Sequence, residues 1–577
     1  MRANGFAVRV VCIVVSIVLT VIGSERAAAA VSANGDNSAN PTTQGADPSI
    51  GLGGLGRLTI NGGNGVISDG ATVGDLPAGI GLVSVTDFNS STGTPSSWTT
   101  NVLYVGDAGM GRLEILNGAL VTVDAAGTPG TGDFVVGNFA DGVGTVIVSG
   151  LGSMLKMGDD TVIGQLGTGT LRIENEGYVL GTNSAAGDTD IFTVGVRGRL
   201  EFGNGRLKTE VFTNHGTITG TGRIDNINPI GNSPTGHIDI GAGQRFVINA
   251  ILDNDGAIAI DGGEMEFFKA LTNSAADAEI TLRDQGILRV SQTGFGFDST
   301  SGVLAATGGT NDVYGTVRIQ TAASKILSTG GSTLVFHDPV TNTGGQIEVF
   351  AGSSIVYLQG LTTTGTSSMT VSLADPETTP SNAVTVTGDA SIAGNLNVNL
   401  ASGFKPSAGD AFEIVSATGT VTGSLNIASA PTLPGGMKWN LLNTGSDISL
   451  SVVATGDYNG NGSVDAGDYV VWRNSQNQQG PGLAADSNGD GFVNTADYSF
   501  WRSRVGNVVS GTGSGGAVPE PAAIALILCG AVLCVCSRRF VPRHYQCWDG
   551  LRSDFDCDMM FLWKALTNSR IQRNWTN

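Results

Sequence analysis

A glycine-punctuated unit recurs along the first third of this chain. Its clearest copies span residues 105–115 (VGDAGMGRLEI) and 163–173 (IGQLGTGTLRI), weaker copies begin at Val136 and Val194, and a partial copy precedes them at 54–60. The leading glycines of the four copies lie 31, 27 and 31 residues apart, at Gly106, Gly137, Gly164 and Gly195. A unit this short cannot bury an apolar face by itself, so we expect the copies to stack on one another.

The composition favours strands in these units. Glycine accounts for 87 of the 577 residues, and charged residues for 14%. So few charges exclude a coiled coil or another charge-rich helical protein. Apolar residues alternate at Leu113 and Ile115, and again at Leu171 and Ile173, and glycine turns flank both segments. This pattern is typical of half-buried strands, so we predict a mainly β chain.

The repeats resemble autotransporter-associated and PEP-CTERM-associated repeats. The resemblance implies a right-handed parallel β-helix, a solenoid of stacked coils. Residues 214–224 and 254–260 look like coils of haemagglutinin-type and adhesin-type solenoids, and residues 384–453, which alternate at Leu396 and Val398, resemble the end of such passenger regions. A set of unrelated β-sandwiches with a shared composition is the alternative architecture.

Two 12-residue segments, 457–468 (DYNGNGSVDAGD) and 486–497 (DSNGDGFVNTAD), begin 29 residues apart. Calcium takes six to eight hard oxygen ligands, which such a loop supplies from positions 1, 3, 5, 7, 9 and 12, with glycine at position 6. Both segments fit this template, so we predict two Ca²⁺ sites. The predicted ligands are Asp457, Asn459, Asn461, the Ser463 carbonyl, Asp465 and Asp468 in the first loop, and Asp486, Asn488, Asp490, the Phe492 carbonyl, Asn494 and Asp497 in the second.

Each loop continues into a matching Tyr-x-x-Trp-Arg segment, at 469–473 and 498–502. Position 12 is Asp instead of the Glu of ordinary EF-hands, and the preceding helix is missing. The tandem unit resembles a type I dockerin, which implies folding on calcium and binding to a cohesin. Cellulosomal dockerins often carry a Ser/Thr pair at loop positions 10 and 11, where this chain has Ala466-Gly467 and Thr495-Ala496. A cohesin-like protein and an envelope component therefore stay open as partners, as does a purely structural role as a calcium-bound cap.

Both ends of the chain carry targeting patterns. A basic start, an apolar run at 10–22 and the alanines at 27–30 predict a secretory signal peptide. Near the other end, Pro-Glu-Pro at 519–521, an apolar run at 522–536 and two arginines at 538–539 resemble the PEP-CTERM sorting signal. This resemblance implies a C-terminal transmembrane helix, processing by an exosortase-type enzyme and delivery to the cell envelope or the extracellular space. The 38 residues after the arginines depart from that family, and they are either a small cytoplasmic tail or a misread gene end.

The predicted organisation has seven parts. In chain order they are a signal peptide at 1–30, a glycine-rich β-solenoid at 51–380, a C-terminal solenoid or β cap at 381–455, a small α dockerin-like EF-hand pair at 456–506, a Gly/Ser linker at 507–517, a sorting anchor at 518–539 and a tail at 540–577. The six cysteines lie at position 12 and from position 529 onward, so the predicted body has no disulfide framework.

No catalytic residue is predicted. The chain has no Gly-x-Ser-x-Gly elbow, His-Glu-x-x-His segment or phosphate loop, and His215, His237 and His337 stand singly among polar turn residues. The net charge of −20 argues against nucleic acid as a partner. We expect an exported structural or adhesin-like protein, with a surface polysaccharide as a further partner. The alternative is a polysaccharide-degrading hydrolase or lyase with its groove on the solenoid. The sequence has no run of strands for an autotransporter barrel.

Overall fold

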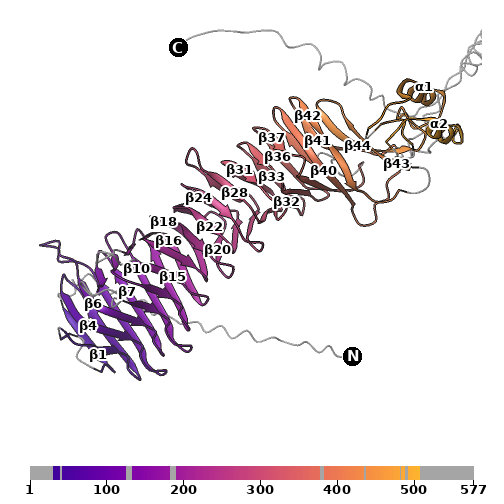
Figure 1. Cartoon of the computed structure of the whole chain (residues 1–577). Coiled ribbons are helices and arrows are strands. Elements are labelled where there is room, and N and C mark those ends of the chain that lie inside the picture. The colour runs from indigo at the N-terminus through magenta and orange to yellow at the C-terminus, as the bar shows by residue number, and fades with distance from the viewer. Residues whose placement is uncertain are drawn as a thin grey trace, which may run out of the picture. The chain divides into compact units, whose positions relative to one another are not determined.

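The computed structural model describes residues 30–38, 42–43, 45–124, 133–181, 190–376, 383–407, 409–433, 437–480, 483–487 and 491–506 (Figure 1). The predicted linker, sorting anchor and tail lie outside these residues, as does all but the last residue of the predicted signal peptide. The described part of the chain is mainly β, with two short helices near its C-terminal end. Among the described residues, no helix is both long enough and apolar enough to cross a membrane.

The strands stack in parallel on three faces, which we call sheets 1, 2 and 3. Sheet 1 contains β3 (Leu55–Ile60), β5 (Ile80–Thr86), β7 (Met110–Leu116), β10 (Val143–Ser149), β13 (Thr168–Glu174), β20 (His237–Ile240), β23 (Ala257–Asp261), β26 (Glu279–Arg283), β29 (Gly302–Thr307), β32 (Ser324–Thr329), β35 (Gln346–Val349) and β38 (Ser368–Leu373). Sheet 2 contains β8 (Leu120–Val123), β11 (Met154–Met157), β14 (Tyr178–Gly181), β21 (Arg245–Asn249), β24 (Glu264–Phe267), β27 (Ile287–Val290), β30 (Thr310–Tyr314), β33 (Thr333–Phe336), β36 (Ser354–Tyr357), β39 (Val384–Val386) and β41 (Ala411–Ala417).

Sheet 3 contains β2 (Ser49–Ile50), β9 (Phe134–Val136), β12 (Thr161–Ile163), β15 (Ile191–Val194), β17 (Val211–Asn214), β19 (Ile230–Asn232), β22 (Leu252–Asn254), β25 (Leu271–Asn273), β28 (Gly296–Ser299), β31 (Thr316–Ile319), β34 (Val340–Asn342) and β37 (Leu361–Thr363). Six longer strands run from one sheet into the next: β4 (Gly65–Val73), β6 (Ser97–Val105), β16 (Gly198–Thr209), β18 (Thr217–Asn226), β40 (Ala390–Leu400) and β42 (Val421–Ser429). One complete coil of the chain therefore contributes one segment to each sheet.

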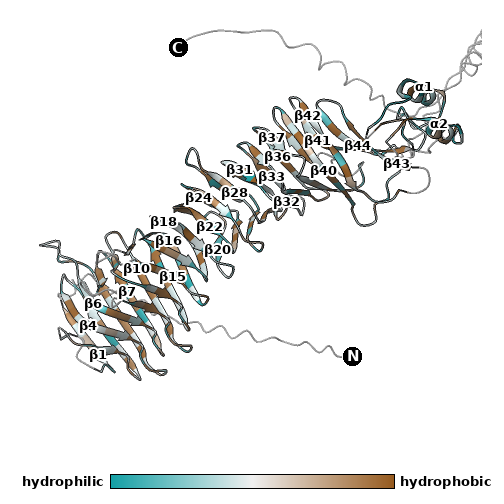
Figure 2. Ribbon diagram, viewed as in Figure 1, coloured by the Kyte–Doolittle hydropathy of each residue, from teal (hydrophilic) through white to brown (hydrophobic). Residues whose placement is uncertain are grey.

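Alternation along each strand sends apolar side chains into the centre of the coil. Leu113 of β7 pairs with Val146 of β10, which pairs with Leu171 of β13, and all three are fully buried. Apolar and polar residues accordingly alternate along the strands in Figure 2. Because each buried row continues through consecutive coils, the core is one continuous column of apolar side chains. The expectation of a mainly β chain is confirmed.

Antiparallel strands lie at both ends of the parallel stack. At the start, β1 (Val31–Gly35) pairs antiparallel with β3. At the end, β41 pairs antiparallel with β44 (Asp447–Ala454), which pairs antiparallel with β43 (Met437–Asn443). These strands satisfy backbone groups that an open edge would expose, and an open edge is a template for unwanted strand pairing.

A row of buried asparagines joins four consecutive coils on sheet 3. Nδ2 of Asn214 donates to Oδ1 of Asn232 over 2.7 Å, Asn232 donates in the same way to Asn254 over 2.7 Å, and Asn254 donates to Asn273 over 3.0 Å. All four side chains are buried. Since a buried amide without partners costs free energy, the row stabilises the register in which the four amides meet.

The repeat glycines occupy sites where neighbouring coils come very close. Gly106 has φ +71°, and a Cβ atom there would lie 2.3 Å from the carbonyl carbon of Val143 in the next coil. Gly111 has backbone atoms of Val73 and Gly106 within 2.2 Å of its Cβ position. Glycine is therefore required by the contact between coils as well as by the turn.

Gly106→Ala and Gly93→Ala separate these two requirements. Gly93 has φ +73° but open space around its Cβ position, so both substitutions strain the backbone alike and only Gly106→Ala adds a clash. Each substitution should lower the free energy required for local opening of the segment around it. We expect this loss to be about 1–3 kcal/mol larger for Gly106→Ala, measured in β7 and β10, than for Gly93→Ala, measured in its own loop. Amide hydrogen exchange of the full chain measures both values. Equal losses would show that the close contact is not limiting.

Candidate metal centre

The two predicted loops each lead directly into a helix. Helix α1 (Ala466–Ser475) begins after its N-cap Asp465, and α2 (Thr495–Arg502) begins after its N-cap Asn494. The side chain of Asp465 accepts a hydrogen bond from the Gly467 amide, and that of Asn494 accepts one from the Ala496 amide, each over 2.7 Å. Position 9 of each loop thus also starts the helix, because it satisfies an amide that would otherwise have no partner.

Position 12 closes each loop on itself. One carboxylate oxygen of Asp468 accepts from the Asp465 amide over 2.8 Å, and the other accepts from the amides of Tyr458 and Asn459 over 2.6 and 2.9 Å. In the second loop, Asp497 accepts from the Asn494 amide and from the Ser487 amide, each over 2.8 Å. The same bonds therefore recur in the two loops at equivalent positions, as the sequence match predicts.

Position 1 organises the turn of each loop. Asp457 accepts from the amides of Gly460, Asn461 and Gly462 over 2.8, 3.1 and 2.7 Å. Asp486 accepts from the Gly491 amide, the equivalent of Gly462, over 2.8 Å. Gly462, the position-6 glycine, has φ +84° and Gly491 has φ +79°, in the left-handed region where glycine is unstrained. In the first loop, the backbone thus wraps around the Asp457 carboxylate.

Burial of these carboxylates creates a demand for positive charge. Asp457 is 3% exposed, and Asp468 and Asp497 are fully buried. Burial raises the pKa of the Asp457 carboxyl, and the nearby Asp468 carboxylate raises it further, against the lowering effect of the amides it accepts from. Within the described residues, no ion pair joins Asp457 or Asp468 to a basic side chain, although the ammonium group of Lys438 interacts electrostatically with Asp457. A hard divalent cation fits this set of buried oxygen donors.

The first loop is described throughout, and amide hydrogen bonds to Asp457 and Asp468 close it into one turn. Asn459 and Asn461 accept from the amides of Asn461 and Ser463 over 3.0 and 2.9 Å. In the second loop, Asn488 and Asp490 lie outside the described residues. No group of three or more His, Cys, Asp or Glu side chains is arranged to hold a metal ion in the described part of the chain. The calcium template also uses side-chain amide oxygens and a backbone carbonyl oxygen, which a search for His, Cys, Asp and Glu side chains does not include.

The helices and loops share a small aromatic core. Tyr458, Trp472, Ala485 and Val493 are buried together, and Tyr469, Tyr498 and Trp501 pack against them. The ring centroids of Trp472 and Tyr498 lie 4.9 Å apart, and those of Tyr469 and Trp501 lie 5.4 Å apart. The aromatic residues of the repeated Tyr-x-x-Trp-Arg segment thus contact across the two helices.

Val464 and Val493, at position 8 of the two loops, are both buried. The backbone of Val493 pairs with that of Gln478 and Asn477, and the Val464 carbonyl accepts from the Gly506 amide. Each valine therefore joins its loop to a segment after a helix, and Val493 also belongs to the aromatic core.

A second polar cluster, which the sequence patterns missed, lies on sheet 2. Nε2 of His337 lies 2.7 Å from Oδ1 of Asp312, and the His337 ring stacks on Tyr314 with centroids 3.9 Å apart. The guanidinium of Arg289 lies 3.9 Å from the centre of the Tyr314 ring, and its Nε is 3.2 Å from Glu264. These residues are 73 positions apart at most. Stacking of coils in parallel register, with Arg289 opposite Tyr314, brings them together.

Arginine–carboxylate contacts continue along sheet 2. Asp225 accepts from Arg206 over 2.5 Å, from Arg223 over 2.7 Å and from Asn249 over 3.0 Å. Burial would raise the pKa of the Asp225 carboxyl, but the hydrogen bonds from Asn249, Arg223 and Arg206 outweigh it and hold the pKa below its usual value. The folded chain therefore stabilises the ionised form of Asp225 relative to the unfolded chain.

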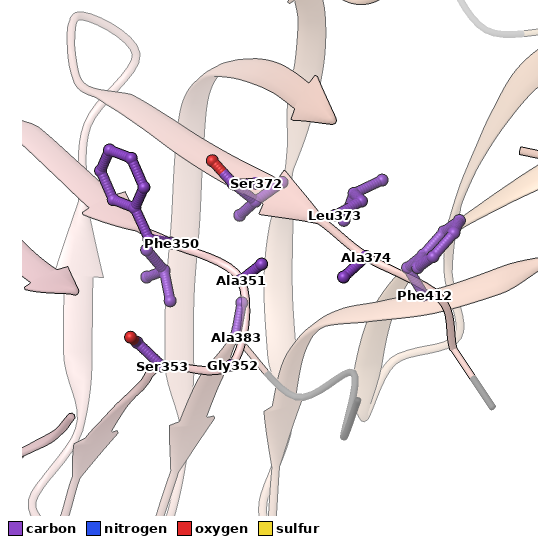
Figure 3. A pocket seen from close by; sticks show the side chains of 11 residues that line it. Phe350, Ala351, Gly352, Ser353, Ser372, Leu373, Ala374, Ala383 and Phe412 are labelled. Carbon is purple, nitrogen blue, oxygen red and sulfur yellow. The ribbon is translucent and has the colours of Figure 1, made fainter. Parts of the chain in front are cut away.

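A small hollow lies near the C-terminal end of the coil stack (Figure 3). Its volume is about 30 Å³, and its lining includes Phe350, Ser353, Ser372, Leu373 and Phe412. None of the residues that line it carries an acidic, basic or imidazole side chain. The hollow therefore offers only hydroxyl and backbone groups to a ligand, and it is not a candidate catalytic site.

Comparison with known families identifies one region. Residues 455–505 match the Dockerin type I domain. No curated protein matches the chain. Type I dockerins bind calcium, and dockerins bind cohesin partners, which agrees with the buried oxygen-rich loops described above. A dockerin also indicates an extracellular or cell-surface protein. This chain therefore contains a type I dockerin domain, a calcium-binding module for protein docking, at residues 455–505.

Asp225→Asn tests the charge network of sheet 2. Because the folded-state pKa is depressed, the stabilisation is present above the unfolded pKa of about 3.9 and is lost as pH falls through the folded pKa. We expect Asp225→Asn to lower the melting temperature at pH 7, and its difference from the wild type to shrink below about pH 4. Asp69→Asn, at an exposed site on β4, is the control. A pH-independent difference would contradict the assignment.

Proposed function

We propose that this chain is an exported surface or matrix protein in which a right-handed parallel β-helix displays a calcium-loaded dockerin. The observation that carries the proposal is the pair of loops with equivalent hydrogen bonds around buried carboxylates. The parallel stack of three-strand coils supports a β-helix, and connections between parallel strands are nearly always right-handed. Export follows from the dockerin and from the targeting patterns at 1–30 and 518–539.

Each loop of the proposed module binds one Ca²⁺. Asp457, Asn459, Asn461, Asp465 and Asp468, with the Ser463 carbonyl, hold the first ion. Asp486, Asn488, Asp490, Asn494 and Asp497, with the Phe492 carbonyl, hold the second. Three carboxylates in each loop balance the ion and leave one negative charge. Calcium thereby adds positive charge beside the buried Asp457 and Asp468, so binding and folding of the module are coupled.

A cohesin-like protein is the proposed partner of the dockerin. On α1, Val470 is 54% exposed, and it provides an apolar contact for a partner. The equivalent residue of α2 is Ser499, so the two helices present different surfaces. Docking attaches the solenoid to a larger assembly at the envelope, where the solenoid acts as a scaffold or an adhesin toward a surface polysaccharide.

The cluster on sheet 2 favours a second candidate function, degradation of a polysaccharide. His337 paired with Asp312, beside Tyr314 and Arg289, provides a proton acceptor and a cation on one face. Polysaccharide hydrolases and lyases need such groups to converge. Arg289 and Glu264 already neutralise each other, and the Tyr314 ring contacts both Arg289 and His337. We therefore prefer the structural function.

Calcium titration of the full chain tests the proposed sites. We expect two Ca²⁺ per wild-type chain by isothermal titration calorimetry, with a change in tryptophan fluorescence as the core around Trp472 and Trp501 orders. Asp457→Ala with Asp486→Ala removes position 1 of both loops and should abolish both signals. Asp69→Ala, in the solenoid, should leave them unchanged. Full binding by the double variant would refute the assigned ligands.

Glycan turnover separates the two candidate functions. We expect no release of reducing ends or unsaturated products from pectin-like, alginate-like or sulfated glycans by the calcium-loaded full chain. Turnover that His337→Ala abolishes, and that Asp69→Ala leaves intact, would replace the structural function by the enzymatic one.

A further inference from the structure

The two tryptophans of the dockerin donate hydrogen bonds crosswise. Nε1 of Trp472, on α1, donates to the carbonyl oxygen of Asn494 over 2.8 Å. Nε1 of Trp501, on α2, donates to the carbonyl oxygen of Asp465 over 3.0 Å. Asn494 belongs to the second loop and Asp465 to the first, and both are position 9. Each helix therefore holds the loop that precedes the other helix.

The two accepting residues are helix N-caps, and their amides donate to the position-12 carboxylates. Asn494 is the N-cap of α2, and its amide donates to the position-12 carboxylate, Asp497. Asp465 is the N-cap of α1, and its amide donates to Asp468. A tryptophan that fixes the peptide group at position 9 therefore limits the motion of two predicted calcium ligands in the opposite loop.

Burial strengthens the Trp472 contact, whereas the Trp501 contact is exposed. Trp472 is only 7% exposed, so water competes weakly for its indole hydrogen bond. A third hydrogen bond joins the two loops directly: Oη of Tyr458, in the first loop, donates to the carbonyl oxygen of Asp497, in the second, over 2.8 Å. Contacts between the rings of Trp472 and Tyr498, and of Tyr498 and Trp501, connect the two donors. The two loops thus share one rigid core.

We propose that Trp472 and Trp501 are positioning residues that couple the two calcium loops, so that an ion in one loop raises the affinity of the other. This inference rests on the proposed function, because it requires two calcium sites. An ion in the first loop orders the start of α1, and α1 carries the donor that holds position 9 of the second loop. The reverse path runs through α2 and Trp501. Reciprocity of this kind is what a coupling free energy between two sites requires.

Single-loop variants of the full chain test the crosswise direction. Asp457→Ala leaves the second loop to bind calcium. In that chain, Trp472→Phe keeps an aromatic ring but removes the donor to Asn494, and we expect it to weaken calcium binding about 5- to 30-fold in calorimetry. Trp501→Phe should change the affinity by less than about threefold. In the Asp486→Ala chain the two effects should be exchanged.

A second measurement does not depend on single-loop variants, whose remaining loop could fail to bind calcium. With both loops intact and calcium-loaded, Trp472→Phe should speed amide exchange in residues 491–497, and Trp501→Phe in residues 462–468. Trp439→Phe is the matched control, because the Trp439 indole also donates to a backbone carbonyl, that of Pro431, outside the dockerin. Faster exchange in each tryptophan's own preceding loop, or equal loss in both loops, would overturn the coupling.

Calcium titration of the wild-type chain tests the two calcium sites and their coupling separately. A chain that binds no calcium, or one ion, contradicts the proposed pair of sites. A chain that binds two ions with a Hill coefficient above 1, reduced to 1 by either Trp→Phe variant, supports the coupling. Two ions bound independently in the wild type would leave the calcium module in place and refute only the role of Trp472 and Trp501.

Discussion

The solenoid depends on parallel backbone pairing between consecutive coils. Each segment finds its hydrogen-bond partners one coil before and one coil after, and the same pairing aligns the inward side chains into continuous apolar rows. Close approach of the coils follows from this pairing, and glycine at positions such as Gly106 and Gly111 allows it. In the asparagine row from Asn214 to Asn273, each buried amide up to Asn254 donates to the asparagine of the next coil. The register, the close contacts at glycine and the buried asparagine row thus all depend on this pairing.

The dockerin is organised by a different interaction, the burial of carboxylates in a small domain. Asp457, Asp468 and Asp497 are nearly inaccessible to water and accept hydrogen bonds from loop amides. Amide donors compensate part of the desolvation of a carboxylate, and a cation compensates the charge itself. The aromatic core between α1 and α2 then ties both loops to one scaffold. A module of this size has too little apolar surface to fold well without such a contribution.

Sequence patterns predicted these features unevenly. The mainly β architecture followed from alternation at Leu113 and Ile115 between glycine turns, because strands have a period of two residues. The dockerin followed from two loops with equivalent spacing, since calcium coordination fixes ligand positions within a short segment. His337 stands singly in the sequence, and the structure places it in a bend after β33, where it contacts Asp312 and Tyr314. Its partners Asp312 and Tyr314 lie one coil earlier, and the pairing register that places them is a property of the stack.

By itself, the sequence determined the local chemistry: strands where apolar residues alternate, turns at glycine, and oxygen-rich loops before the two helices. The tertiary structure decided which distant residues meet. It placed four asparagines in one buried row, gathered arginines and carboxylates on sheet 2, and crossed the hydrogen bonds of Trp472 and Trp501. The physical reason is distance along the sequence. Strand periodicity and the calcium-loop template each involve residues within about a dozen positions of one another. Contacts between coils or between helices depend on a register that only the packed chain sets.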